Sequence, residues 1–369
     1  FLYLIKAALA QLPANIKCGQ NQKNQTNNDL NHCPHQRLTP CHQSAVYSTA
    51  IRTNLLMKRT HGTMPAMLKS KKFWGIILSF FFLWLALQKV DWKHVPAILA
   101  SLRFEFLFLI FISYTLEHLI RAFRWQQILF ERSFPFKTAY FGVVIGYFFN
   151  NILPARAGEF FRAYYLKRKK VSGGSEAFGS VVFERFLDGV IIVSLLVFSM
   201  QNFKTTPLIE KASVSAIVFY CLVLVGIMLL QFKRNLFVKI SSAVFNLLPE
   251  KLAIKLGNSR DSFIDGLGLI GKPVVFVKAL FTSFIAWGVS ILTLWMSLQM
   301  FSIDFGFNQT ALLISVLAIG SMIPSSPGMI GIYQFCCVIT LNGIFGLSND
   351  IAATFGLVCH FISYMYVLV

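Results

Sequence analysis

Long apolar stretches, separated by short basic or turn-rich segments, run along most of the chain. A helix that crosses a bilayer needs about 20 mostly apolar residues. Measured against that length, full or partial membrane segments are predicted at Phe73–Val90, Phe104–Phe123, Tyr140–Leu153, Phe178–Met200, Val214–Phe232, Val274–Phe301, Ala311–Ile323, Ile330–Phe345 and Ile351–Val369. The predicted fold class is all-α, a polytopic transmembrane helical bundle with about 7–9 membrane segments.

Two of these segments, 140–153 and 311–323, are too short to cross a bilayer upright. The first runs into NNILPARAGEFFRAYYL and the second into MIPSSPGMIG, and each continuation has a proline and a glycine four residues apart. The first segment follows a basic loop, and the second follows the charge-poor loop 302–309. Short segments interrupted by Gly and Pro in two halves of a chain point to the central site of a transporter. We therefore predict two re-entrant or broken helices that are related as an inverted repeat.

Proline and glycine explain the predicted interruptions. Proline lacks a backbone N–H and ends or kinks a helix, while glycine permits the tight turn from which the next helix starts. The freed backbone groups find no partner in lipid, so such a break is buried in protein or faces a wet cavity. A purely structural kink, satisfied by neighbouring helices, is the competing interpretation. The predicted hinge and half-helix residues are Pro154, Gly158, Pro324, Pro327, Gly328 and Gly331.

Charged and polar residues gather at the first break and on the segment 178–200. A charge at mid-membrane costs about 2.5–3.5 kcal/mol, so it faces the bundle interior and pairs. Glu159 and Arg162 are spaced for pairing on one helix face. Glu184 and Asp188, four residues apart, suit the arginines of the first break. The candidate substrate-binding residues are Asn151, Arg156, Glu159, Arg162, Glu184, Arg185, Asp188, Ser325 and Ser326. A structural ion-pair cluster near the cytoplasmic interface explains the same charges equally well.

Basic residues set the predicted orientation. They precede the first segment as KSKK, follow the second, and recur as KRKK at 167–170. The positive-inside rule places these loops, and the start of the membrane domain, in the cytoplasm. Arg121 and Arg124, at the end of the second segment, are interpreted as orientation anchors of this kind.

Composition supports a membrane protein and separates the first part of the chain from the rest. Hydrophobic residues make up 56% and charged residues 13%, against about 25% charged in soluble domains. Residues 1–66 are rich in Asn and Gln and show no helical period, which predicts a disordered or wrongly assigned N-terminal extension. Residues 67–369 form the predicted transmembrane domain. Because the sequence stays apolar to Val369, we expect it to continue beyond that residue.

The common catalytic motifs are absent from the sequence. It contains no HExxH, P-loop, GxSxG or dinucleotide-binding fingerprint, so no catalytic residue is assigned. A non-enzymatic role is favoured, and acid/base chemistry by Glu159 or Glu184 stays open as the alternative. Cys33 and Cys41 lie among three histidines, but the spacing matches no closed zinc site. No metal and no cofactor are expected. The net charge of +19 makes anionic lipid, not nucleic acid, the natural neighbour.

Four motifs together resemble a known family. RAFRWQQIL, NNILPARAGEFFRAYYL, SVVFERFLDGV and IPSSPGMIGIYQF occur in the order and spacing of the flippase-like membrane domain of lysylphosphatidylglycerol synthases. In two-part members of that family, this domain moves an aminoacylated lipid between leaflets, and a soluble domain attaches the amino acid. The resemblance implies a stand-alone member that lacks the soluble synthase domain. The positions that match the family's motifs are hinge and charged residues named above.

The resemblance carries expectations about function. It implies a multi-pass protein of the bacterial inner membrane that translocates a phospholipid or a polyprenyl-linked lipid between leaflets. The alternative is a membrane subunit or enzyme of lipid or lipid-linked glycan biosynthesis, for example of aminoacyl-lipids or hopanoids. The expected partners are anionic phospholipid or polyprenyl-phosphate lipid and a separate synthase or glycosyltransferase.

Overall fold

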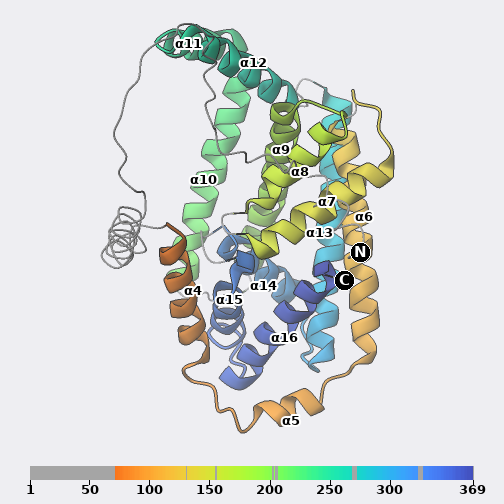
Figure 1. Ribbon diagram of the computed structural model, residues 1–369. Helices are drawn as coiled ribbons and strands as arrows, with labels where there is room; N and C mark the ends of the chain where they lie inside the picture. Colours follow the sequence, from red (N-terminus) through yellow and green to blue (C-terminus); the bar gives the residue numbers. More distant parts are fainter. Residues whose placement is uncertain are drawn as a thin grey trace, which may run out of the picture. The chain divides into compact units, whose positions relative to one another are not determined.

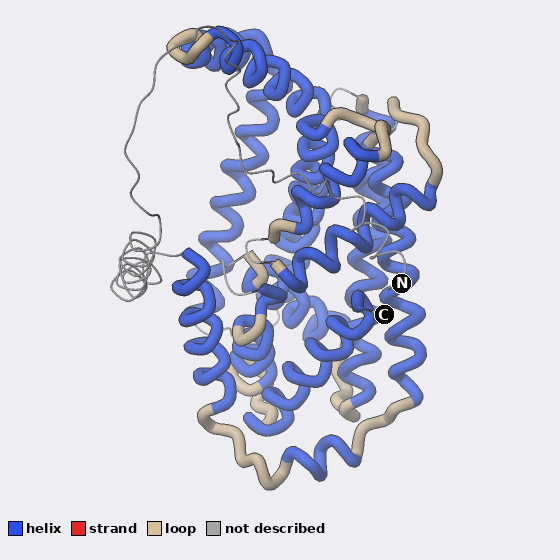
Figure 2. The backbone as a smooth tube through the Cα atoms, viewed as in Figure 1, coloured by secondary structure: helices blue, strands red, loops and turns tan. Residues whose placement is uncertain are grey.

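The computed structural model describes residues 71–129, 131–153, 156–201, 203, 207–267, 272–322 and 327–368 (Figures 1 and 2). Residues 71–368 form one compact unit. The extension predicted for residues 1–66 lies outside the described residues and stays a prediction. Within the described ranges the elements are helices and the turns between them, with no strand, which confirms the all-α prediction.

The helices follow the predicted membrane segments closely. In chain order they are α4 (Lys71–Leu87), α5 (Val95–Ala100), α6 (Glu105–Ile128), α7 (Phe136–Ile152), α8 (Gly158–Arg168), α9 (Gly174–Met200), α10 (Pro207–Phe232), α11 (Arg234–Phe245), α12 (Glu250–Gly266), α13 (Pro273–Met300), α14 (Phe307–Gly320), the 3-10 turn η2 (Pro327–Met329), α15 (Ile332–Leu341) and α16 (Asn349–Leu368). Each of the nine predicted segments overlaps one of these helices. Among the described residues, α6, α13 and α16 are long and apolar enough to cross a membrane.

The most extensive helix contact joins α6 to α13, which run side by side (Figure 1). A strip of small, buried residues at spacings of three and four lies along α13, namely Ala279, Ser283, Ala286, Ser290, Thr293 and Ser297. Small residues let helix backbones approach closely in a membrane. Each hydroxyl of the strip donates to the carbonyl four residues earlier, so these polar groups are satisfied without water.

Helix α9 is central to the bundle, because it packs against α6, α8, α10, α12, α13 and α14. Gly179 allows the close approach of α12: a Cβ there would lie 2.4 Å from the Phe263 carbonyl oxygen. Charged residues of α9 therefore lie inside the protein, where they need partners from neighbouring helices.

The second half of the unit has its own apolar core between α14, α15 and α16. Leu312, Leu313, Cys337, Leu341 and Phe355 are fully buried in it. Helices α11 and α12 lie at one end of the bundle, and α5 lies at the opposite end (Figure 1). The short helices α7, α8, α14 and α15 lie between these ends.

Candidate functional site

The first predicted interruption separates α7 from α8. The Gly158 N–H donates to Asn150 Oδ1 at 2.9 Å, which gives one unpaired donor at the start of α8 an acceptor. A Cβ at position 158 would lie 1.9 Å from the Gly146 carbonyl oxygen, so only glycine lets α8 approach α7 this closely. Arg156 has φ +52, a left-handed conformation that costs energy for a residue with a side chain.

The second interruption lies between α14 and α15. Gly328 and Gly331 have φ values of +66 and +89, which favour glycine. Gly331 N–H donates to Gln334 Oε1 at 2.8 Å, and Gln334 Nε2 donates to His360 Nδ1 at 2.9 Å. His360 Nε2 then donates to the Gly328 carbonyl oxygen at 2.8 Å. Because Gln334 supplies a donor and the carbonyl accepts, His360 is the neutral Nε2–H tautomer and ties this break to α16.

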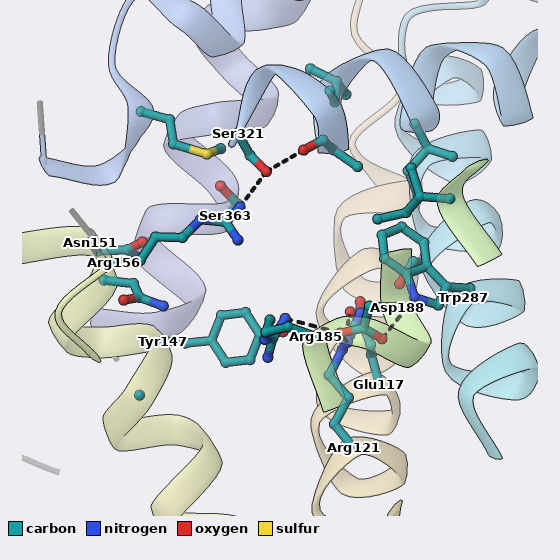
Figure 3. Close-up of a pocket in the computed structure, with 18 of the residues that line it drawn as sticks. Glu117, Arg121, Tyr147, Asn151, Arg156, Arg185, Asp188, Trp287, Ser321 and Ser363 are labelled. Carbon is teal, nitrogen blue, oxygen red and sulfur yellow. Dashed lines mark hydrogen bonds and ion pairs between the residues drawn. The ribbon is translucent and has the colours of Figure 1, made fainter. Parts of the chain in front are cut away.

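The two interruptions lie against each other, with α7 in contact with η2. The Arg156 guanidinium donates to Ser321 Oγ, as Figure 3 shows. Tyr364 OH donates to the Asn151 carbonyl oxygen at 3.0 Å. The same hydroxyl fills the space left by the missing side chain of Gly328. Helix α16 therefore joins both breaks through residues on one of its faces.

Several predicted residues lie outside the described residues, and their roles stay predictions. These are Pro154, Pro324, Ser325 and Ser326, together with Cys33 and Cys41 of the rejected zinc pattern. Pro327 begins η2, but its side chain is likewise outside the description. Gly331 faces α4, where a Cβ would lie 2.2 Å from the Ser79 carbonyl oxygen.

A buried ion-pair network centred on Glu184 of α9 lies beside the breaks. Arg162 forms a bidentate ion pair with this carboxylate, in which Nη1 donates to Oε1 at 2.8 Å and Nη2 donates to Oε2 at 2.7 Å. Arg124 and Arg185 contact Glu184 Oε1 at 3.0 and 2.9 Å. The Arg162 guanidinium also lies over the Trp125 ring, 3.7 Å from its centroid. The pairing of α9 carboxylates with the arginines of the first break is thus confirmed for Arg162.

Asp188, one turn further along α9, holds the second part of the network. Its Oδ1 accepts from Arg124 at 2.6 Å and from the Trp287 indole at 3.0 Å. Its Oδ2 accepts from Arg185 at 3.0 Å. Since one buried arginine contacts both carboxylates of α9, the two parts of the network are one structural unit.

The interpretation of Arg121 and Arg124 as cytoplasmic anchors is wrong. Both are buried, at 4% and 0% exposure, on α6, which continues to Ile128. Arg121 pairs with Glu117 at 2.8 Å and lies 3.5 Å from Asp188. The positive-inside rule applies to loops, whereas here the longer helix turns both arginines toward α9. Glu117, one turn before Arg121 in an apolar segment, is the sequence signal for this pairing.

The predicted pairing of Glu159 with Arg162 is also wrong. Glu159 contacts Arg185 at 3.3 Å, while Arg162 turns to Glu184. A pair on one helix surface contributes only about 0.2–0.5 kcal/mol, whereas a buried charge left unpaired costs far more. Partners on the adjacent helix therefore prevail. Glu184 itself is fully buried, so in this conformation it offers no surface to a ligand.

A cavity of about 630 Å³ lies between the two breaks and the network (Figure 3). Asn151 and Arg156 line it at the first break and Ser321 at the second, while Arg185 and Asp188 lie across from them. Its wall also includes residues that sequence reasoning did not assign to the site, namely Glu117, His118, Tyr147, Trp287, His360 and Tyr364. These residues come together only through the packing of α6, α7, α13 and α16.

Comparison with known proteins supports a family assignment. The sequence model of the lysylphosphatidylglycerol synthase TM region matches residues 72–369. The UPF0104 membrane protein MJ1595 of Methanocaldococcus jannaschii is 33% identical over 135 residues, which are 36% of this chain and 40% of that protein. The UPF0104 membrane protein MJ1078 of the same organism is 26% identical over 202 residues, 53% of this chain and 79% of that protein. The match thus spans less than half of the first relative, and no solved structure matches.

The family match covers both interruptions, helix α16 and the charged face of α9. The membrane location that the helical spans indicate agrees with it. The chain therefore belongs to the family of the lysylphosphatidylglycerol synthase TM region.

Proposed function

We propose that this protein translocates a phospholipid or a polyprenyl-linked lipid between the leaflets of the inner membrane. The observation that carries the proposal is the meeting of two interrupted helices, bridged by Arg156 and Ser321, at one cavity whose wall includes charged side chains. A headgroup that crosses the hydrocarbon layer must exchange its water for other polar partners. Interrupted backbone and inward-facing charges supply such partners inside a membrane protein.

The size and lining of the cavity suit a lipid headgroup. Its volume of about 630 Å³ lies within the range of about 300–1,000 Å³ usual for small-molecule sites. Phe219 and Val223 of α10 line the same cavity. Because Phe219 is also 49% exposed, apolar surface continues from the cavity to the outside of the bundle. The acyl or prenyl chain would follow this surface while the headgroup enters the cavity.

The residues around the cavity would have two roles. Arg156, which reaches into the cavity, would bind the headgroup. The pairs formed by Glu184 and Asp188 would hold α6, α8 and α9 in place. Buried ion networks add little net stability but resist disruption, because breaking one pair leaves an uncompensated charge.

The family description supports a lipid substrate, and we extend the proposal to location and partners. The start of the membrane domain would lie in the cytoplasm, as the basic KSKK and KRKK segments suggest. A separate synthase or glycosyltransferase would supply the lipid that this protein moves.

Leaflet exchange in reconstituted vesicles tests the proposal. A trace of fluorescent phospholipid is quenched from outside, and the rate at which inner-leaflet lipid becomes accessible is measured. Exchange should exceed that of protein-free vesicles, and Arg156→Ala should slow it by about tenfold, the effect of losing one charged hydrogen bond. Arg132→Ala is the matched control, because Arg132 pairs with Glu176 at 2.8 Å and does not line the cavity. Exchange equal to that of empty vesicles would leave the alternative, a subunit or enzyme of lipid biosynthesis.

A further inference from the structure

The charges around the cavity do not cancel. Four carboxylates of the described residues face the cavity or its network, and four guanidiniums pair with them. The carboxylates are Glu117, Glu159, Glu184 and Asp188, and the guanidiniums are Arg121, Arg124, Arg162 and Arg185. Arg156 is the fifth guanidinium at the cavity. No described carboxylate lies within ion-pairing distance of it, so the cavity and its wall carry one net positive charge.

Arg156 has only a neutral partner among the described residues. Its guanidinium donates to Ser321 Oγ, which itself donates to the Ala318 carbonyl oxygen. The serine hydroxyl has a single proton, so it accepts from Arg156 and has no proton left for a ligand. A guanidinium has five N–H donors in a planar fork, and most of those on Arg156 remain available for an oxyanion.

Every carboxylate that lines the cavity is already bonded to an arginine. Glu117 accepts from Arg121 at 2.8 Å, and Glu159 contacts Arg185 at 3.3 Å. Asp188 accepts from three arginines and an indole. A cationic headgroup would therefore meet carboxylates whose charge an arginine already balances, and Arg156 would repel it. Figure 3 shows this arrangement, with Arg156 and Ser321 apart from the group around Asp188.

From this charge balance we infer that the cavity selects a lipid whose headgroup carries net negative charge, with its phosphate bound by Arg156. The inference rests on the proposed function and names the substrate class within it. A lipid made net cationic by an added basic amino acid falls outside this class. The phosphate takes the guanidinium donors that face the cavity, and Ser321 keeps the side chain in position.

Binding in detergent tests the inference separately from transport. Native mass spectrometry of the purified full-length chain, with equal amounts of phosphatidylglycerol and phosphatidylcholine, gives the ratio of the two lipids bound. We expect the anionic lipid to exceed the zwitterionic one by about tenfold, the effect of one charged hydrogen bond. Arg156→Gln should bring the ratio near one, Arg156→Lys should retain part of the preference, and Arg132→Gln should leave it unchanged.

A second variant shows whether a lost preference could come from misfolding. Ser321→Ala removes the hydroxyl that positions Arg156 but leaves the guanidinium charge, so it should lower the preference for phosphatidylglycerol less than Arg156→Gln does. Equal binding of the two lipids by the wild type, or a preference that survives Arg156→Gln, overturns the inference. Vesicle exchange of the same two lipids separates the claims. Exchange without headgroup preference contradicts the inference alone, and preferential binding without exchange contradicts only the proposed function.

Discussion

Substitution of Gly158 tests most sharply whether the first break depends on the close approach of α8 to α7. Replacing it with alanine adds one carbon at the start of α8. That carbon would lie 1.9 Å from the Gly146 carbonyl oxygen, 2.7 Å from Asn150 Oδ1 and 2.8 Å from Asn150 N. Two of these atoms belong to the α7 backbone, which has no rotamer with which to move aside. The helices α7 and α8 must therefore separate by about 1 Å or more, because close-packed interiors leave no slack.

The cost follows from the overpacking and from what the shift breaks. Inserting a methyl group into a packed core costs about 1–3 kcal/mol, and a backbone clash belongs at the upper end. The same shift carries Arg162 of α8 away from Glu184, whose two contacts with it measure 2.8 and 2.7 Å. Gly158→Ala should therefore lower both thermal stability and leaflet exchange.

Gly288→Ala is the matched control for this prediction. Gly288 lies inside α13, and nothing lies within 4 Å of a Cβ built there. Alanine in an open helical position stabilises by about 0.5–1 kcal/mol, so this variant should melt at or above the wild-type temperature. Melting of both variants is followed in the same detergent. The reasoning is refuted if Gly158→Ala melts as the wild type does, or if the two alanine variants behave alike.

Three further predictions concern the buried network, a surface pair and the second break. Asp188→Asn should destabilise the protein by about 3–5 kcal/mol in denaturant titration, because it leaves buried arginines uncompensated. The control Glu105→Gln changes an exposed pair and should cost less than about 1 kcal/mol. Equal effects of the two substitutions would contradict burial of the network. The hydrogen bond to Asp350 raises the pKa of His94 above its usual 6.5. The stabilisation that this pair gives the folded protein is therefore complete below pH 6.5 and is lost as pH rises through the higher pKa of His94 in the folded state. The melting temperature should fall across that window, and His94→Gln should flatten the profile; an unchanged profile would argue against the pair. His360→Phe keeps an aromatic ring but removes both hydrogen bonds of the imidazole, so it should slow leaflet exchange, and wild-type exchange would show that the second break does not need this support.

Helix positions and interruptions were predictable because they depend on local chemistry. Apolar length places the membrane segments, and the proline and glycine spacing marks where a helix must stop. Gly158 and Gly328 lie at sharp turns for the expected reasons: a close backbone approach and a positive φ. The relation of the two halves as an inverted repeat stays a prediction.

Pairing of the charges was not predictable in the same way. Arg121 and Arg124 follow an apolar segment, and only the length of α6 decides whether they belong to a loop or to the buried face. Glu159 has a partner at helical spacing but turns to Arg185 of another helix. Contacts across helices depend on helix register and crossing, which the order of residues along the chain does not encode locally.

Helix α16 was the largest omission from the predicted site. His360 and Tyr364 lie one turn apart in an apolar segment without a polar motif. Their importance arises from contacts with Gly328 and Asn151, which are distant in sequence. Such contacts require the tertiary arrangement of α7, η2 and α16.

Blocking the cavity tests the central claim most directly. Ser321→Cys places one thiol where the two breaks meet, and Ser101→Cys places the control thiol on an exposed turn after α5. The exposed Cys221 and the cysteines at positions 18, 33 and 41 are replaced by serine, and Cys359, which lines the cavity, is replaced by alanine. A bulky maleimide at position 321 should stop exchange of phosphatidylglycerol in reconstituted vesicles, while labelling at position 101 should leave it unchanged. Unaltered exchange after complete labelling at position 321 would contradict a headgroup path through this cavity.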